Sequence, residues 1–361
     1  MSHNLHTAVA SVALSDVITR YPRAIGRNAV LGNHGTGPTA PAVTITTTDG
    51  ATGWGLLGGH CDDPASLVGR HVDELFDPGV GVLDPVNQWA DFALHDLAGV
   101  LTGQSVHTIL GDHGGQEIST YDGSIYFDDL DPVDAPRGID VVLANVQDGW
   151  DDGHRAFKIK IGRGFTWMGE NEGFQRDVDV VHAVHEAFPA ARLLVDGNNG
   201  FTVEAAIRFL ERVADVGLFW FEEPFNEHRN GLQRLRDWRR STGSEVLIAD
   251  GEYRPDVAEV VRFAEEGLVD VLLMDVVGFG LTPWRALAAQ LGGSEIKISP
   301  HAWGLPIKTF YAGQMAVGLA DVITVEGVRG ETQGLVGGYA VTEGFLSVPD
   351  TPGFGLSITG S

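Results

Sequence analysis

The sequence predicts an α/β protein in which a closed parallel β/α barrel follows a smaller α+β domain. From residue 119 onward, short apolar runs alternate with helical patterns, which is typical of parallel β/α folds with buried strands. The number of these units favours a closed barrel over an open sheet. The chain has 361 residues, of which 43% are hydrophobic, so it is long enough for a barrel and a second domain.

The first part of the chain carries strand signals followed by a helix. Loose alternation and an Asp-Gly turn predict a strand and then a hairpin, over residues 6–18, 42–48 and 51–57. Apolar residues recur at helical spacing between Pro85 and Gly103. We therefore expect an α+β domain over residues 1–115, with the Gly- and Pro-rich tail, residues 331–361, packing back on it.

The predicted barrel covers residues 116–330. Its strands are expected at seven apolar runs, namely 156–161, 192–195, 218–221, 246–249, 269–274, 296–299 and 321–325. Helical patterns lie between these runs, for example over 203–213 and 283–291.

Composition restricts the partners. The net charge is −25, with 49 acidic against 24 basic residues, which argues against nucleic acid and against an anionic membrane. This acidity fits a high-salt cytoplasm or simply an acidic surface. Cys61 is the one cysteine, so no internal disulfide is expected, and no Cys/His cluster in the sequence suggests zinc. Without a signal peptide or membrane span, we expect a cytoplasmic protein, and we expect it to be a homo-oligomer.

Polar residues follow the apolar runs at intervals of about one β/α unit. In a β/α barrel, the active site lies where the strands end. The residues at these positions are Lys158, Lys160, Asp196, Glu222, Glu252, Asp275, His301 and Glu326. Such residues often cap the following helix, but Thr202 and Thr282 are better placed for capping. We therefore expect Asp196 and Asp275 to point freely into the barrel mouth.

Three of these residues suggest a metal site. Asp196, Glu222 and Glu252 come from three adjacent strands, and three unpaired carboxylates would repel one another. A hard divalent cation removes this repulsion, and Mg²⁺ is preferred because it binds carboxylates together with water or substrate oxygens. The alternative is a salt-bridge network with arginines.

The chain has only four lysines, Lys158, Lys160, Lys297 and Lys308. Strand alternation places Lys158 and Lys160 on the same side, and two ammonium groups would be unstable among apolar helices. We therefore expect both in the barrel interior. Beside a metal ion, a partly desolvated lysine has a lowered pKa and can act as a general base. The alternative is a pair of solvated surface lysines.

His301 and Asp275 follow neighbouring strands of the predicted barrel. A carboxylate that accepts one ring N–H fixes the histidine tautomer and raises the basicity of the other nitrogen. The pair therefore predicts a second acid/base group. An isolated core histidine is the alternative.

The motifs together resemble the enolase superfamily, mandelate racemase subgroup, over most of the chain. They are Phe157-Lys-Ile-Lys-Ile161, Val195-Asp-Gly-Asn-Asn199, Phe221-Glu-Glu-Pro224, Asp250-Gly-Glu252, Met274-Asp275 and Pro300-His301. The resemblance implies a modified TIM (β/α) barrel with an N-terminal α+β capping domain.

The resemblance also implies roles for the site residues. Mg²⁺ would be bound by Asp196, Glu222 and Glu252, while Lys160 and the Asp275–His301 dyad would be the two acid/base groups. Lys158 would neutralise the substrate carboxylate and Glu326 would hydrogen-bond it. We expect further substrate contacts from Asn198 and Trp303.

The expected chemistry is removal of the proton next to a carboxylate, through an enediolate. We expect dehydration of an acid sugar to a 2-keto-3-deoxy acid, because His301 can act as the acid that releases hydroxide. Racemisation or epimerisation, lactone cycloisomerisation and a non-catalytic acid-sugar sensor are the alternatives. The run at 269–274 is followed by no lysine, which argues against the muconate cycloisomerase branch. Specificity is expected from residues 23–37 and from Trp303, although these loops could equally be ordinary surface connections. Residues 162–173 could line the mouth or only pack.

Overall fold

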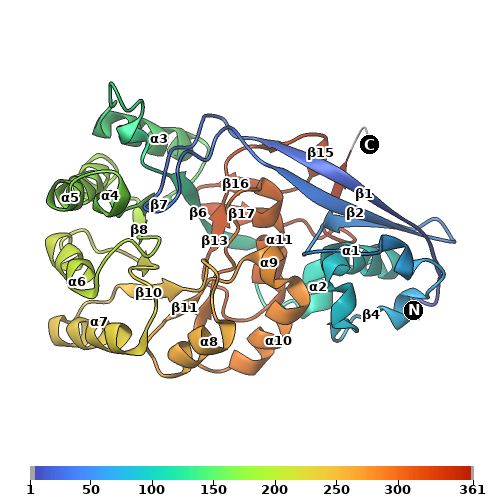
Figure 1. Ribbon diagram of the computed structural model, residues 1–361. Helices are drawn as coiled ribbons and strands as arrows, with labels where there is room; N and C mark the ends of the chain where they lie inside the picture. Colours follow the sequence, from blue (N-terminus) through green and yellow to red (C-terminus); the bar gives the residue numbers. More distant parts are fainter. Residues whose placement is uncertain (1–4, 359–361) are drawn as a thin grey trace.

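The computed structural model describes residues 5–358, and shows a barrel with a sheet-and-helix domain beside it (Figure 1). The antiparallel sheet of this domain contains β1 (Val9–Arg20), β2 (Thr39–Thr47) and β3 (Thr52–Leu56). The predicted first strand and hairpin are thus confirmed. The predicted helix is also present, although it begins as the 3₁₀ turn η3 (Pro85–Ala90) before α1 (Asp91–Thr102).

Short elements complete this part of the chain. They are η1 (Pro64–Leu67), η2 (Val72–Glu74), β4 (Phe76–Asp77), β5 (Gly81–Val82) and α2 (Val106–Leu110).

The barrel strands are all parallel to their neighbours. They are β6 (Glu117–Ile125), β7 (Ala156–Lys160), β8 (Arg192–Asp196), β9 (Trp220–Glu222), β10 (Leu247–Asp250), β11 (Val271–Leu272), β12 (Lys297–Ile298) and β13 (Val325–Gly327). β13 pairs with β6, and a bridge from Ile298 to Val322 joins β12 to the segment before β13. Strand pairing therefore runs from β12 through β6 to β13, and the single bridge at Ile298 links the two ends of this path.

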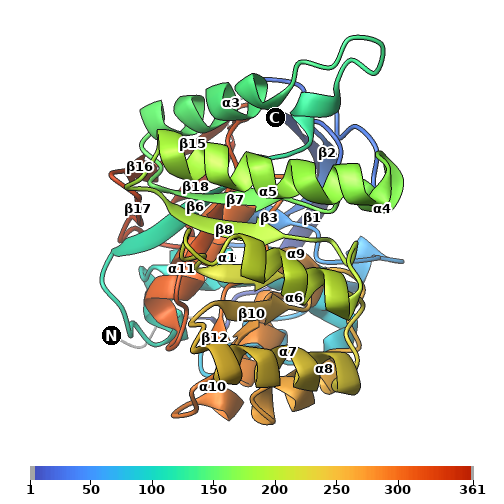
Figure 2. The ribbon, with the colours of Figure 1, turned by 90° about the vertical axis from the view of Figure 1, so that its left-hand side faces the viewer.

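Each of the seven predicted runs overlaps one of these strands, but the first strand, β6, was not predicted. The helices between strands are η4 (Asp128–Leu130), α3 (Ile139–Asp151), α4 (Arg163–Thr166), α5 (Glu170–Ala187), α6 (Val203–Arg212), α7 (Arg229–Thr242), α8 (Val257–Glu265), α9 (Val276–Phe279), α10 (Leu281–Leu291) and α11 (Pro306–Gly318). Figure 2 shows α3, α5, α6 and α7 one below another on the outer side of the barrel.

The core between strands and helices fixes which side chains face inward. On β7, Phe157 and Ile159 are fully buried and belong to the large apolar cluster that includes Val181 and Val184 of α5. Burying a side chain of this size contributes about 1.5–3 kcal/mol. Because side chains alternate along a strand, Lys158 and Lys160 must then face the barrel interior.

The tail contacts both parts of the molecule. β14 (Glu331–Thr332) pairs with β1, whereas β17 (Phe345–Ser347) pairs with β6 of the barrel and with β16 (Ala340–Thr342). β15 (Leu335–Gly337) pairs with β18 (Leu356–Ile358). The contact with β1 was expected and the pairing with β6 was not. The domain limits 1–115, 116–330 and 331–361 stay predictions.

Across residues 5–358, none of the helices combines the length and the apolar character that crossing a membrane requires.

Candidate active site

Three carboxylates meet at one edge of the barrel. Asp196 ends β8, Glu222 ends β9, and Glu252 follows β10. Asp196 and Glu222 are direct partners in the parallel ladder, so their side chains emerge side by side. One oxygen of each of the three carboxylates lies within 4.8 Å of the others. The structure therefore brings together the three residues that the sequence predicted as metal ligands.

The electrostatics of this group favour a cation. Burial raises the pKa of Glu222 well above its usual range, and the charges of Asp196 and Glu252 add to this effect although Lys158 opposes it. Within residues 5–358, Glu222 Oε2 and Glu252 Oε2 accept no hydrogen bond. Buried oxygens without donors, all from carboxylates, are the ligands that a hard cation such as Mg²⁺ takes. The donor set therefore fits the predicted ion.

The two lysines of β7 lie inside the barrel against these carboxylates. Lys158 Nζ is 2.7 Å from Glu222 Oε1 and 2.9 Å from Glu326 Oε1, and Lys160 Nζ donates to Asp196. Both side chains are buried, so the alternative of solvated surface lysines is wrong. The carboxylates pair with lysine and histidine among the described residues, and not with the arginines of the other alternative.

The pKa of Lys160 is raised, whereas the sequence predicted a lowered pKa. Burial alone lowers the pKa of this lysine, but the carboxylate of Asp196 outweighs burial and the pKa is raised. The expected lowering assumed a cation next to the lysine, which would offset the charge of Asp196.

His301 and Asp275 form the predicted pair. His301 Nδ1 lies 3.1 Å from Asp275 Oδ2, and its Nε2 lies 3.2 Å from Glu252 Oε1. His301 follows β12, and Lys160 ends β7. Around the barrel, β6 and β13 lie between these two strands in one direction, and β8 to β11 lie between them in the other. The histidine and the lysine therefore approach the carboxylate group from different sides.

The capping prediction is half right. Thr202 caps α6 as expected, because its side chain accepts from Ala205 N. Asp275 is not free of capping: its Oδ1 accepts from Val277 N and Gly278 N at the start of α9. Thr282 caps no helix and donates instead to Asp91. The short helix α9, which the sequence pattern did not predict, is the reason for the error.

Glu326 of β13 lies between the backbone N–H of Ala302 and the ammonium group of Lys158. Its Oε2 accepts from Ala302 N at 2.9 Å, while its Oε1 faces Lys158. A Cβ atom at Gly123 of β6 would lie 2.3 Å from Oε1, so only glycine leaves room for this carboxylate.

Asn198 lies against the carboxylate of Asp196. Its backbone N–H donates to Asp196 Oδ1 at 2.8 Å, and its side-chain nitrogen is 3.5 Å from Oδ2. Its own Oδ1 has no hydrogen-bond partner in residues 5–358. The side chain is thus placed beside the carboxylate of Asp196.

An aromatic wall lines the barrel mouth. Trp303 lies 4.8 Å from Tyr126 and 5.7 Å from Tyr21 between ring centroids, and the His34 ring is 4.7 Å from that of Tyr126. Lys160 Nζ is 5.2 Å from the centre of the Tyr126 ring. His34 donates from Nδ1 to Gly26 O at 2.7 Å, and because burial lowers the pKa of this histidine, Nε2 of the neutral ring is an acceptor. Residues 23–37 therefore contact the ring that lies against Lys160, while their part in specificity stays a prediction.

The segment 162–173 packs and also supports this loop. Arg163 is fully buried between Asp129 and Asp177, at 2.7 Å from each. Trp167 Nε1 donates to Asn28 O at 2.6 Å, which attaches the segment to the loop of the first domain.

Sequence reasoning missed Tyr126 and Lys308. Lys308 Nζ donates to Asp275 and to Trp303 O, the latter at 2.9 Å. The scarcity of lysine could have identified Lys308, since it is one of only four. Tyr126 could not be found, because β6 itself was not predicted.

Comparison with known proteins agrees with this fold. The family model described as "Enolase C-terminal domain-like" matches residues 141–361. The chain is 29% identical over 284 residues to the D-galactarolactone cycloisomerase of Agrobacterium fabrum, covering 74% of this chain and 70% of that protein.

Two solved structures are similar over nearly the whole chain. A galacturonate dehydratase from Geobacillus sp., complexed with D-galacturonate and 5-keto-4-deoxy-D-galacturonate, has a TM-score of 0.92 and 29% identity, covering 98% of this chain and 95% of that one. A mandelate racemase/muconate lactonizing protein from Geobacillus sp., complexed with magnesium and tartrate, has the same TM-score and identity, covering 98% and 93%. By fold, motifs and family match, the chain belongs to the enolase superfamily and is a mandelate racemase-like enzyme.

Proposed function

We propose that this enzyme dehydrates an acid sugar to a 2-keto-3-deoxy acid with the help of Mg²⁺. The observation that carries the proposal is the placement of Lys160 and His301 around one group of three carboxylates, with His301 held by Asp275. Dehydration needs a base for the α proton and an acid for the leaving hydroxyl, and these are the two groups present.

The substrate carboxylate would bind beside Lys158 and Glu326. Lys158 supplies a buried positive charge next to Glu326. Burial alone would raise the pKa of Glu326, but the charges of Lys158 and His301 lower it, so Glu326 would donate a hydrogen bond to the substrate carboxylate only after taking up a proton when the substrate binds. When bound to Asp196, Glu222 and Glu252, Mg²⁺ would supply further positive charge to the oxygens on which negative charge develops.

The proton steps follow from the geometry of the chain's own residues. Lys160, as the free amine, takes the proton from the carbon next to the carboxylate. His301, as the imidazolium, then protonates the hydroxyl on the adjacent carbon, the C–O bond breaks and water leaves. The resulting enol takes up a proton at the β carbon and loses the proton of its hydroxyl group, which gives the 2-keto-3-deoxy acid, so the net change is loss of one water. Asp275 supports the charged form of His301 during these steps.

D-galacturonate is the first substrate to test. The structure with a TM-score of 0.92 was solved with D-galacturonate and its 5-keto-4-deoxy product, in which the keto carbon is next to the carboxylate. The proposed chemistry also places the keto group next to the carboxylate and the deoxy carbon next to the keto group.

Lactone cycloisomerisation is the second candidate, and the likeness to D-galactarolactone cycloisomerase favours it. Both reactions begin with the same proton abstraction by Lys160. They differ in the leaving group, which is water in dehydration and the lactone oxygen in ring opening.

The test is a panel of uronates, aldonates, aldarates and aldarolactones with the purified enzyme and Mg²⁺. We expect 2-keto acid from at least one open-chain acid sugar, with loss of activity in EDTA and recovery on adding Mg²⁺. α-Proton exchange in D₂O without keto acid would reject dehydration, and turnover of lactones alone would favour the cycloisomerase. Binding with neither exchange nor product would indicate a sensor.

A further inference from the structure

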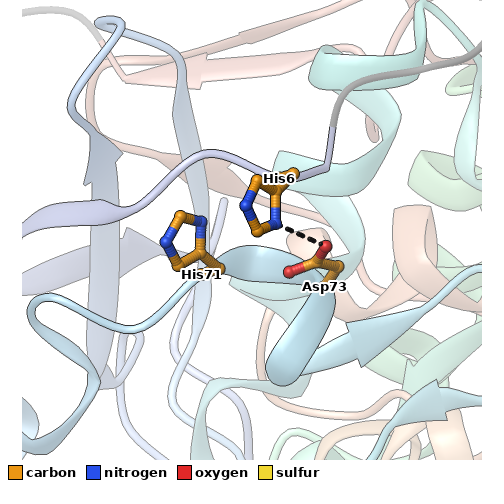
Figure 3. Close-up of side chains that lie close together, drawn as sticks. All are labelled: His6, His71 and Asp73. Atoms are coloured by element: carbon orange, nitrogen blue, oxygen red, sulfur yellow. Dashed lines mark hydrogen bonds and ion pairs between the residues drawn. The ribbon is translucent and has the colours of Figure 1, made fainter.

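A second group of candidate metal ligands lies in the first domain, apart from the barrel carboxylates. We propose that His6, His71 and Asp73 form a binding site for one divalent transition-metal ion of the Zn²⁺ type. One ligand atom of each residue lies within 4.8 Å of the others, and Figure 3 shows the three side chains facing one another.

Backbone pairing holds these residues together. Asp73 N donates to Leu5 O at 3.2 Å, and Val72 N donates to Thr7 O at 3.0 Å. Ala8 forms an antiparallel bridge with His71. The segment that enters β1 therefore runs along η2, and this arrangement fixes the three Cα positions before any ion binds. Preorganisation of this kind lowers the cost of binding.

The ligand atoms of these three residues suit a transition metal better than Mg²⁺. His6 Nδ1 lies 3.0 Å from Asp73 Oδ2, and His71 Nδ1 is enclosed. In Figure 3 one ring nitrogen of His71 is turned toward His6. Two imidazoles and a carboxylate are ligands that Zn²⁺ takes, whereas Mg²⁺ prefers oxygen alone. The net charge of −25 raises the concentration of cations near the surface.

A small movement completes the site. Zn–N and Zn–O bonds of about 2.0–2.1 Å place tetrahedral ligand atoms about 3.3 Å apart. The His6 and His71 rings are stacked, with centroids 4.0 Å apart and planes at 14°, so one ring must tilt for both nitrogens to face one ion. The His6 side chain is 70% exposed, so tilting it gives up mainly its stacking on His71. Water would take the fourth position.

The experiment measures Zn²⁺ binding to the full-length chain without a histidine tag, by calorimetry in excess Mg²⁺. We expect one Zn²⁺ per chain at this site, a rise in the melting temperature on binding, and a four-coordinate visible spectrum with Co²⁺. His6→Ala and Asp73→Asn should each weaken Zn²⁺ binding roughly tenfold or more, since even residues that only orient a ligand have effects of that size.

Two variants serve as controls. His60 is an exposed histidine of the same domain that lies 2.9 Å from Asp62, so His60→Ala should leave Zn²⁺ binding unchanged. Glu222→Gln should also retain the Zn²⁺ site. Equal binding by the wild type and His6→Ala, or loss of Zn²⁺ in Glu222→Gln, would overturn the proposal. Neither result depends on which substrate the barrel accepts.

Discussion

The two carboxylate oxygens of Asp275 accept hydrogen bonds from different groups. Its Oδ1 caps α9, while its Oδ2 accepts from both His301 and Lys308. Burial alone would raise the pKa of Asp275, but the charge of Lys308 and the contact with His301 lower it. Lys308 also donates to the backbone oxygen of Trp303, so one side chain fixes both the dyad and the aromatic wall.

We therefore expect Lys308→Met to lower kcat for dehydration roughly tenfold to a hundredfold, as is usual for residues that orient a functional group from outside. KM should change less than kcat, because the hydrogen bonds of Lys308 go to Asp275 and to the backbone oxygen of Trp303, and not to Lys158 or Glu326, which we propose to bind the substrate carboxylate. Exchange of the α proton through Lys160 should continue at nearly the wild-type rate. Steady-state kinetics and proton NMR in D₂O measure these quantities.

Lys297 provides the matched control. It lies at the start of β12, away from the mouth, and donates to Asp321 at 2.6 Å. Lys297→Met should keep the wild-type kcat, and Lys308→Arg should recover part of the lost activity. If Lys297→Met were as impaired as Lys308→Met, the loss would reflect stability and not positioning.

At the scale of elements, helix α1 is joined to a strand and to the tail by one buried carboxylate. Asp96 accepts hydrogen bonds at 2.8 Å from Trp54 N of β3 and from Phe354 N of the tail. Burial raises its pKa from the ordinary value of 3.8 to about 7, although both donors favour the charged form. The folded chain therefore binds this proton more tightly than the unfolded chain does.

The contribution of Asp96 to the free energy of unfolding follows from this difference. It is fully present below about pH 4 and is lost as the pH rises to about 7, because only the folded state favours the proton in that range. Asp96→Asn removes this dependence and leaves one backbone N–H without an acceptor, at a cost of about 1–3 kcal/mol. Urea unfolding at pH 5 and pH 8 should show a smaller gap between wild type and variant at pH 8. A gap that grows with pH would contradict the assignment.

Elements differ in how well the sequence predicted them. The strands from β7 onward were found because their outward faces pack on helices and are apolar. β6 was missed because it contains buried polar residues that form hydrogen bonds inside the fold: Asp122 Oδ1 accepts from Ser124, and Thr120 donates to Val325 O of β13. Hydrogen bonds of this kind remove the need for an apolar run, and no local pattern reveals them.

The same limit applies to the site residues. Asp196, Glu222 and Glu252 were predicted to meet because each follows a strand, and a parallel barrel brings strand ends together. His6 and His71 were not connected, since they are 65 residues apart and the backbone pairing between their segments has no signature in the sequence. The roles of the site residues, the oligomeric state and the location in the cell stay predictions.

For the whole molecule, the net charge of −25 is the dominant electrostatic feature. Repulsion among surface carboxylates opposes the compact state, and salt reduces it as the Debye length falls from about 10 Å at 0.1 M to about 3 Å at 1 M. We expect the melting temperature at pH 7 to rise when KCl is raised over this range. Near pH 4.7, the isoelectric point of the sequence, the same change should have little effect. An equal rise at both pH values would indicate a cause other than charge.

The central claim is that Lys160 removes the α proton and His301 releases the hydroxyl. Proton NMR in D₂O, with an acid sugar that the wild type dehydrates, measures both steps in Lys160→Met and His301→Asn. We predict that His301→Asn still exchanges the α proton but forms no keto acid, and that Lys160→Met does neither. Exchange at the wild-type rate in Lys160→Met would contradict the account, because another group would then be the base.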